Sequence, residues 1–64
     1  MTAEGERAGV MIVRIWLERG HENGLRARLT ESSDLASREQ TTHSAASVDE
    51  IVELVRTWAE SFER

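Results

Sequence analysis

The sequence predicts an α+β fold, in which a two- or three-stranded antiparallel β-meander packs on one C-terminal α-helix. Two segments between residues 10 and 31 carry apolar side chains at every second position, the period of a strand. The segment from 47 to 62 repeats apolar residues at steps of three and four, the period of a helix. We therefore expect residues 9–63 to form one small domain. Residues 1–8 are polar and aperiodic, and we expect a disordered tail there.

The two alternating segments predict a β-hairpin. In the stretch GVMIVRIWLERG, residues 9–20, every odd-numbered position from 11 to 17 is apolar: Met11, Val13, Ile15 and Leu17. In the next segment the inward positions are also odd-numbered: Leu25, Ala27 and Leu29. The intervening RGHENG, residues 19–24, supplies two glycines and an asparagine, which favour a chain reversal. The odd-numbered side chains of both strands should share one face.

The register of this hairpin follows from its charges. Because the inward residues are odd-numbered on both strands, the numbers of two opposed residues must sum to an even number. A sum of 42 places Arg14 opposite Arg28, which sets like charges against each other. A sum of 44 places Glu18 opposite Arg26 and Trp16 opposite Arg28, an ion pair and a cation–π contact. We predict the register that sums to 44.

Residues 32–46 carry a weaker pattern. Leu35 keeps the phase of the second strand, so that strand is predicted to continue to it, with a turn at residues 36–38. Residues 39–45, EQTTHSA, would then return as a third strand, which the two threonines favour. A short polar helix that begins at Ser33 or Asp34 is the alternative.

The C-terminal segment predicts an amphipathic helix. Ser47 followed by Glu50 just before the apolar pattern is typical of a capping box. Leu54 widens an apolar stripe that faces away from Glu53, Arg56, Thr57 and Glu60. A single helix of this length is marginal in water, so it needs the sheet as a partner surface. The stripe consists of Val48, Ile51, Val52, Val55, Trp58, Ala59 and Phe62.

The predicted order of strand, strand, strand and helix resembles a known arrangement. The segments VRIWLE (13–18), RARL (26–29) and SVDEIVELV (47–55) resemble small stand-alone bacterial β-β-β-α proteins of unassigned function. The same order is similar to that of HicB-like antitoxin domains, which neutralise a partner toxin. The resemblance covers most of residues 10–62 at the level of the fold. It implies a protein partner in the case of the antitoxins, and it assigns no functional residue.

The residue types needed for catalysis or metal binding are sparse. The chain has no cysteine and two histidines, His21 and His43, which is too few for the three or four converging ligands of a zinc site. Gly20 and Gly24 bracket a turn that no helix follows, so they do not form a phosphate loop. We expect no catalytic residues, no metal site and no cofactor, and therefore no enzyme.

Composition narrows the setting and the partners. The net charge of −4 argues against a general affinity for nucleic acid, and the longest apolar run, residues 10–13, is far too short for a membrane span. The lack of cysteine suits a reducing cytoplasm. All eight basic residues are arginine, which is typical of a GC-rich genome, and the resemblance to small bacterial proteins implies a bacterial source.

The even-numbered side of the predicted sheet is the candidate interaction face. If the helix covers the odd-numbered side, an unusual number of aliphatic, tryptophan and arginine side chains remain uncovered, and these types are enriched in binding sites. We predict a non-catalytic interaction module that forms a homodimer, or binds a small protein partner, through this face or an edge strand. The alternative is a single-stranded nucleic-acid-binding or antitoxin-like regulator that uses Trp16 and the strand arginines. The predicted face consists of Val10, Ile12, Arg14, Trp16, Arg26 and Arg28.

Overall fold

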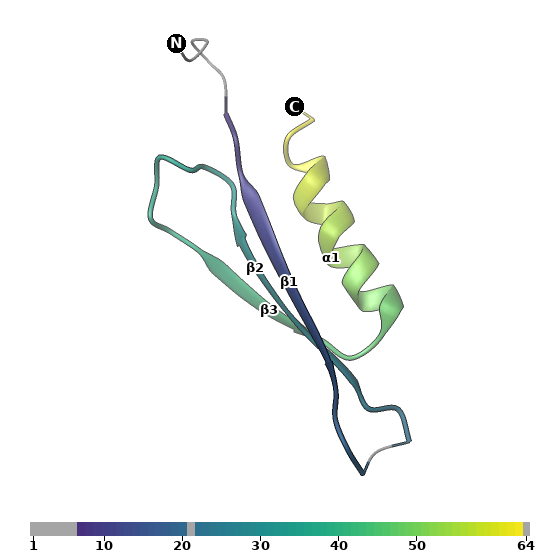
Figure 1. Cartoon of the computed structure of the whole chain (residues 1–64). Coiled ribbons are helices and arrows are strands. Elements are labelled where there is room, and N and C mark those ends of the chain that lie inside the picture. Colours follow the sequence, from purple (N-terminus) through teal and green to yellow (C-terminus); the bar gives the residue numbers. More distant parts are fainter. Residues whose placement is uncertain (1–6, 21, 64) are drawn as a thin grey trace.

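Three antiparallel strands and one helix make up the part of the chain that the structure describes. The computed structural model describes residues 7–20 and 22–63, so that most of the predicted N-terminal tail, as well as His21, lies outside the described residues. The strands form one sheet in the order β1-β2-β3, and the helix follows them (Figure 1). This confirms the α+β fold in its three-stranded form. The elements are β1 (Val10–Leu17), β2 (Leu25–Ser32), β3 (Thr41–Ala45) and α1 (Val48–Glu60).

The register of β1 on β2 differs from the prediction. Opposed residue numbers sum to 42, so Arg14 faces Arg28 and Trp16 faces Arg26. The turn decides the register: the Glu18 N–H donates to the Gly24 carbonyl at 2.7 Å, and Gly20 takes a left-handed φ of 85° in between. Both opposed arginines are exposed, and water screens their repulsion. The cost of the like-charge pair is therefore small compared with the geometry of the turn.

The expected charge contacts form with other geometry. Arg26 Nε lies 3.2 Å from Glu18 Oε1, although these residues are diagonal neighbours rather than directly opposed. The Arg14 guanidinium, and not that of Arg28, lies over the Trp16 ring at 5.3 Å from its centroid. The Arg26 side chain reaches a diagonal position across the sheet, and Arg14 and Trp16 are neighbours on the same side of β1 itself, so neither contact fixes the register.

The segment after β2 forms a turn and then the third strand. Strand β2 ends at Ser32, so the predicted continuation to Leu35 is wrong. Asp34 reverses the chain: its Oδ1 accepts from the Ala36 N–H at 3.0 Å, and its carbonyl accepts from the Ser37 N–H at 2.9 Å. The third strand is confirmed, although it covers Thr41–Ala45 and begins two residues later than predicted, and the alternative helix from Ser33 or Asp34 does not form.

Helix α1 begins where the capping signature predicts. Ser47 is the N-cap, and its Oγ accepts from the Glu50 N–H at 3.1 Å. Glu50 Oε1 accepts in return from the N–H of Ala46, one residue before the cap, at 2.6 Å. At the other end, Phe62 packs edge-on against Trp58 and lies under the Arg7 guanidinium. Gly9 permits this approach, because a Cβ there would lie 2.8 Å from the Phe62 ring.

The core is small and lies between α1 and the odd-numbered side of the sheet. Ala27, Leu29 and Ala45 are buried, and Leu29, at 0% exposure, is the one large side chain that is fully buried among the described residues. Met11, Ile51 and Leu54 pack against these three and are half-buried. The predicted inward face is therefore correct for Ala27 and Leu29 of β2, and Ala45 of β3, for which no inward face was predicted, joins them. The prediction is only partly correct for β1, where Val13, Ile15 and Leu17 stay exposed.

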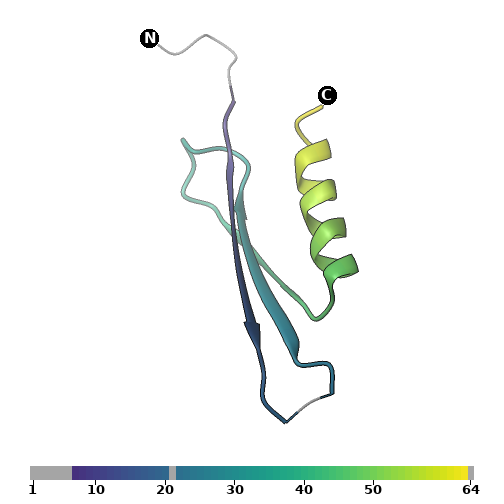
Figure 2. The same cartoon turned by 45° about the vertical axis from the view of Figure 1, so that its right-hand side comes forward.

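The β1–β2 hairpin extends beyond the rest of the fold. Strand β3 ends at Ala45, which pairs with Ala27, and α1 then turns back along the sheet. The end of the hairpin around residues 16–26 consequently has neither a third strand nor a helix beside it (Figures 1 and 2). Leu17, with 77% of its surface exposed, lies in this part.

Candidate interaction surfaces

The predicted interaction residues share one side of the sheet, which we call the open sheet face: Val10, Ile12, Arg14, Trp16, Arg26 and Arg28. Their even numbers and the register of β1 on β2 place them together, opposite to the side that α1 covers. Val10 and Ile12 are 45% and 62% exposed. Trp16 and Arg26 are half-buried. The open sheet face is thus a surface with an apolar end, at the start of β1, and a cationic end.

The arginines of the open sheet face are not equivalent. Arg26 is engaged within the hairpin, because it contacts the Glu18 carboxylate and donates from Nη1 to the Leu25 carbonyl at 2.8 Å. Arg14 and Arg28 are exposed and directly opposed. Among the residues that the structure describes, no carboxylate lies within ion-pair distance of either one. Two neighbouring cations are therefore available to an anion on this face.

A second uncovered surface lies on the helix side, and we call it the apolar strip: Val13, Ile15 and Leu17 of β1 with Val48, Val52 and Val55 of α1. These six aliphatic side chains are 36–77% exposed. The strip exists because α1 packs on β2 and β3. One helix is about 10 Å wide, whereas three strands at about 4.8 Å spacing span more than that. A single helix therefore leaves one strand of this sheet uncovered.

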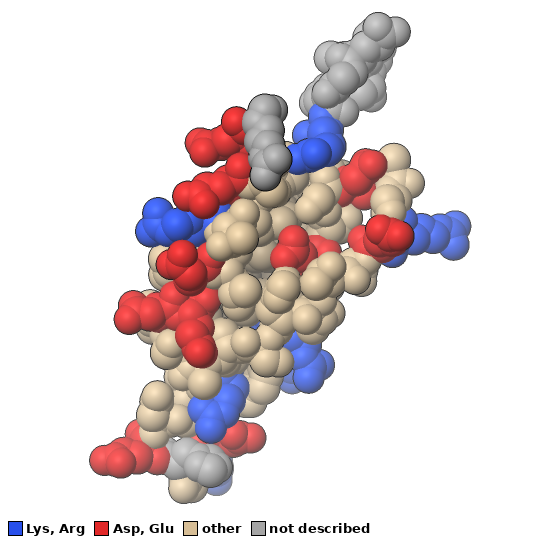
Figure 3. All heavy atoms as spheres, turned by 180° about the vertical axis from the view of Figure 1, so that it is seen from behind, with Lys and Arg blue, Asp and Glu red and all other residues tan. Residues whose placement is uncertain are grey.

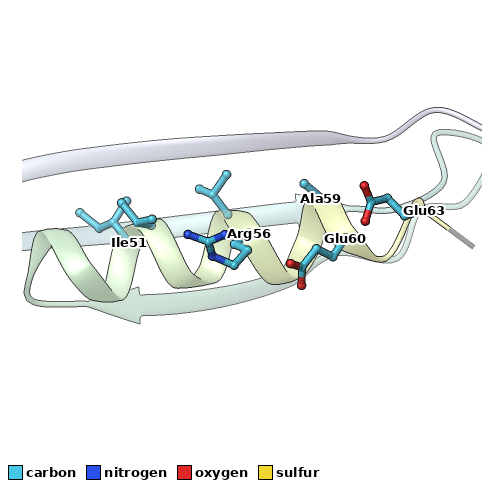
Figure 4. Close-up of a pocket in the computed structure, with 7 residues that line it drawn as sticks. Ile51, Arg56, Ala59, Glu60 and Glu63 are labelled. Carbon is cyan, nitrogen blue, oxygen red and sulfur yellow. The ribbon is translucent and has the colours of Figure 1, made fainter.

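The helix contributes a groove to this surface. An open groove of about 460 Å³ runs along α1 and is lined by Ile51, Val52, Val55, Arg56, Ala59, Glu60 and Glu63. In Figure 4, Ile51 and Ala59 point from the helix toward the side on which β1 runs, and β3 lies on the opposite side. The charged side chains Arg56 and Glu60 lie away from β1, whereas Glu63 lies on the β1 side at the C-terminal end of the groove. Between these charged residues, the part of the groove formed by Ile51 and Ala59 is apolar and faces the side of β1.

The residues of the apolar strip are recognisable in the sequence as apolar, but all of them were predicted to lie in the core. The missed signal is the width of the helical stripe. Ile51, Leu54 and Trp58 are the half-buried residues of α1. Val48, Val52, Val55 and Ala59 form a parallel row one step around the helix and are exposed. One row of apolar side chains is enough for the helix to pack on the sheet, so the second row of the stripe is left exposed.

Chemistry-bearing side chains meet at one other place, beside β3. His43 Nε2 lies 2.6 Å from Glu31 Oε2 across β2 and β3, and both side chains are partly exposed. A polar hollow of about 330 Å³ adjoins Glu31 and is lined mainly by Ser33, Asp34, Ser37, Glu39 and Thr41. Within residues 7–20 and 22–63, no group of three or more His, Cys, Asp or Glu side chains is arranged to hold a metal ion.

Charge is distributed without a continuous basic area on the side of the molecule opposite to the view of Figure 1. Figure 3 shows acidic side chains gathered along one flank of this side, and arginines placed singly among them. A surface that tracks a nucleic-acid backbone accumulates positive charge. The side seen in Figure 3 does not have that character.

Comparison with known proteins leaves the fold and these two surfaces as the basis for a functional argument. No family model, no curated protein and no solved structure matches the chain. The resemblance to HicB-like domains therefore stays a prediction. In the described part of the chain, no helix combines the length and the apolar character that crossing a membrane requires.

Proposed function

We propose that this chain is a non-catalytic interaction module that self-associates. The observation that supports this is the imbalance between its core and its surface. Leu29 is fully buried, whereas nine large aliphatic side chains of the described residues are exposed. Domains of this size are marginal, and a disulfide, a metal or a partner often completes their core. The sequence has no cysteine, so a second protein surface is the stabiliser that fits the exposed aliphatic residues.

The apolar strip is the stronger of the two candidate surfaces. It gathers six exposed aliphatic side chains from two elements, and the charged residues Arg56, Glu60 and Glu63 line only the adjoining groove. The open sheet face offers Val10 and Ile12 beside Arg14 and Arg28, whose desolvation opposes docking of an apolar partner. We therefore assign self-association to the helix side of β1. The absence of cysteine fits a reducing compartment, and we propose the cytoplasm.

A second candidate function rests on the open sheet face. Arg14 and Arg28 are directly opposed without a carboxylate partner in the described residues, and Trp16 lies beside Arg14. A tryptophan that stacks a base, next to arginines that hold phosphates, is how sheet surfaces bind single strands. One aromatic residue and a net charge of −4 make this a weaker fit than self-association.

One sedimentation experiment tests both functions. The chain alone is expected to sediment at twice its mass of 7.2 kDa at tens of micromolar, with little change between low and moderate salt. A labelled single-stranded oligonucleotide added to it is expected to sediment free of the protein. A monomer at every accessible concentration would contradict the proposed function. Oligonucleotide that sediments with the protein at low salt and is released by moderate salt would support the second candidate instead.

A further inference from the structure

Within residues 7–20 and 22–63, no strand pairs with the outer edge of β1. The Glu18 N–H donates to Gly24, so even-numbered residues direct their backbone groups toward β2. The backbone groups of Met11, Val13, Ile15 and Leu17 therefore point to the free edge. Natural edge strands are usually protected by lysine, proline, a bulge or short length. The eight residues VMIVRIWL contain no lysine, proline or bulge; their one charged side chain, Arg14, lies on the open sheet face and not on the side of the apolar strip.

The other free edge of the sheet is a poorer template. Strand β3 is five residues long and reads TTHSA, so it offers fewer backbone groups and almost no apolar side chain. The free edge of β1 is also bordered by the apolar strip. An added strand at β1 thus gains main-chain hydrogen bonds and apolar contacts together.

The occupant that fits β1 best is β1 of a second copy. An antiparallel pair of identical strands has a two-fold axis perpendicular to the sheet, so both helices lie on one side. The odd-numbered side chains of the two copies then form one continuous apolar surface. A strand edge alone buries mostly backbone, whereas a stable dimer usually buries about 800 Å² per partner. The two apolar strips, which meet at the axis, supply the additional apolar area.

Side-chain chemistry selects the register. The odd-numbered side chains of both copies lie on the same side of the sheet, so an odd-numbered residue of one copy must oppose an odd-numbered residue of the other. The two-fold axis therefore passes through a residue of β1. Two positions near the middle of β1, Val13 and Arg14, give the longest overlap. An axis at Arg14 would align two copies of the opposed Arg14 and Arg28 in one row of four guanidinium groups. An axis at Val13 instead sets Met11 opposite Ile15 of the second copy.

We propose that two copies of this chain join edge to edge through β1, with Val13 opposite Val13 of the second copy, in one continuous six-stranded antiparallel sheet. This inference rests on the proposed function and specifies its partner and geometry. The open sheet face stays free on the other side of the dimer.

Cysteine cross-linking tests the geometry, because the chain contains no cysteine of its own. In Val13→Cys the two opposed Cα atoms should lie about 5.5 Å apart, within the usual range for a disulfide of roughly 4.4–6.8 Å. In Met11→Cys the cysteines of the two copies would be four positions apart along the strands, so their Cα atoms would be roughly 14 Å apart. Thr42→Cys, on the outer edge of β3, is the matched control. Under mild oxidation, Val13→Cys is expected to form the disulfide dimer at least tenfold faster than the other two.

The outcome separates this inference from the proposed function. A Val13→Cys rate no higher than that of Thr42→Cys, or fastest cross-linking in Met11→Cys, would overturn the edge-to-edge arrangement. If the wild-type chain still sediments as a dimer, only the geometry fails, whereas a monomer removes both proposals. Val13 is partly exposed and cysteine is close to valine in size, and a circular dichroism spectrum like that of the wild type shows that each variant folds.

Discussion

Replacing Ile15 with glutamate is expected to convert the proposed dimer into monomers, whereas the same replacement at Ile12 is expected to leave the chain dimeric. The two residues lie on the same strand and are similarly exposed, at 54% and 62%, but on opposite sides of the sheet. A carboxylate at position 15 would enter the apolar strip in both copies, at about 1–3 kcal/mol for each unpaired polar group. We expect the dimer to weaken by roughly 100-fold, which corresponds to about 2.7 kcal/mol.

Ile12→Glu is the informative control because of its predicted neighbour. With the axis at Val13, position 12 lies opposite Arg14 of the second copy, so a glutamate there gains an ion pair. Sedimentation equilibrium of both variants measures the two dissociation constants. A dimer that is lost in Ile12→Glu and kept in Ile15→Glu would place the contact on the open sheet face and would contradict self-association through the apolar strip.

Leu29→Ala is expected to have the largest effect on folding. Leu29 is the fully buried large side chain at the centre of the contact between β2 and α1. Truncation of a buried leucine to alanine costs about 2–5 kcal/mol, since the remaining residues only partly fill the cavity. In a domain of this size about 1 kcal/mol shifts Tm by roughly 4–8 °C, so a fall on the order of 10–30 °C is expected.

Leu35→Ala is the matched control for that substitution. Leu35 is 60% exposed, and its N–H, which donates to the Ala8 carbonyl, is kept in alanine. Its effect should stay within about 0.5 kcal/mol. Thermal unfolding followed by circular dichroism compares the two variants. Equal Tm values for both would contradict the position of the core.

The helix and the hairpin were predictable because local signals specify them. Ser47 caps α1 as the spacing to Glu50 predicts, and the glycines of residues 19–24 reverse the chain. The register was predicted wrongly because it was chosen from charged pairs between exposed side chains. Such pairs contribute little free energy in water. The hydrogen bond between Glu18 and Gly24 is decisive and has no signature in the side chains.

The apolar strip was not predictable from periodicity alone. The alternation in β1 predicts that Val13, Ile15 and Leu17 share one side of the sheet, and α1 does lie on that side. Periodicity does not predict over which of the three strands the helix packs. That position follows from the tight packing of Leu54 and Ile51 on Ala27 and Ala45, whose small side chains let the helix approach β2 and β3 closely. Strand β1 is left open as a consequence.

Amide exchange in β1 tests the central claim most directly. The outward N–H groups of Met11, Val13 and Ile15 are free in a monomer and hydrogen-bonded in the proposed dimer, whereas those of Ile12, Arg14 and Trp16 bond to β2 in both states. At high concentration both sets should exchange slowly, and on dilution the odd-numbered set alone should become fast. Rapid exchange of the odd-numbered amides at every concentration, beside protected even-numbered ones, would contradict the account.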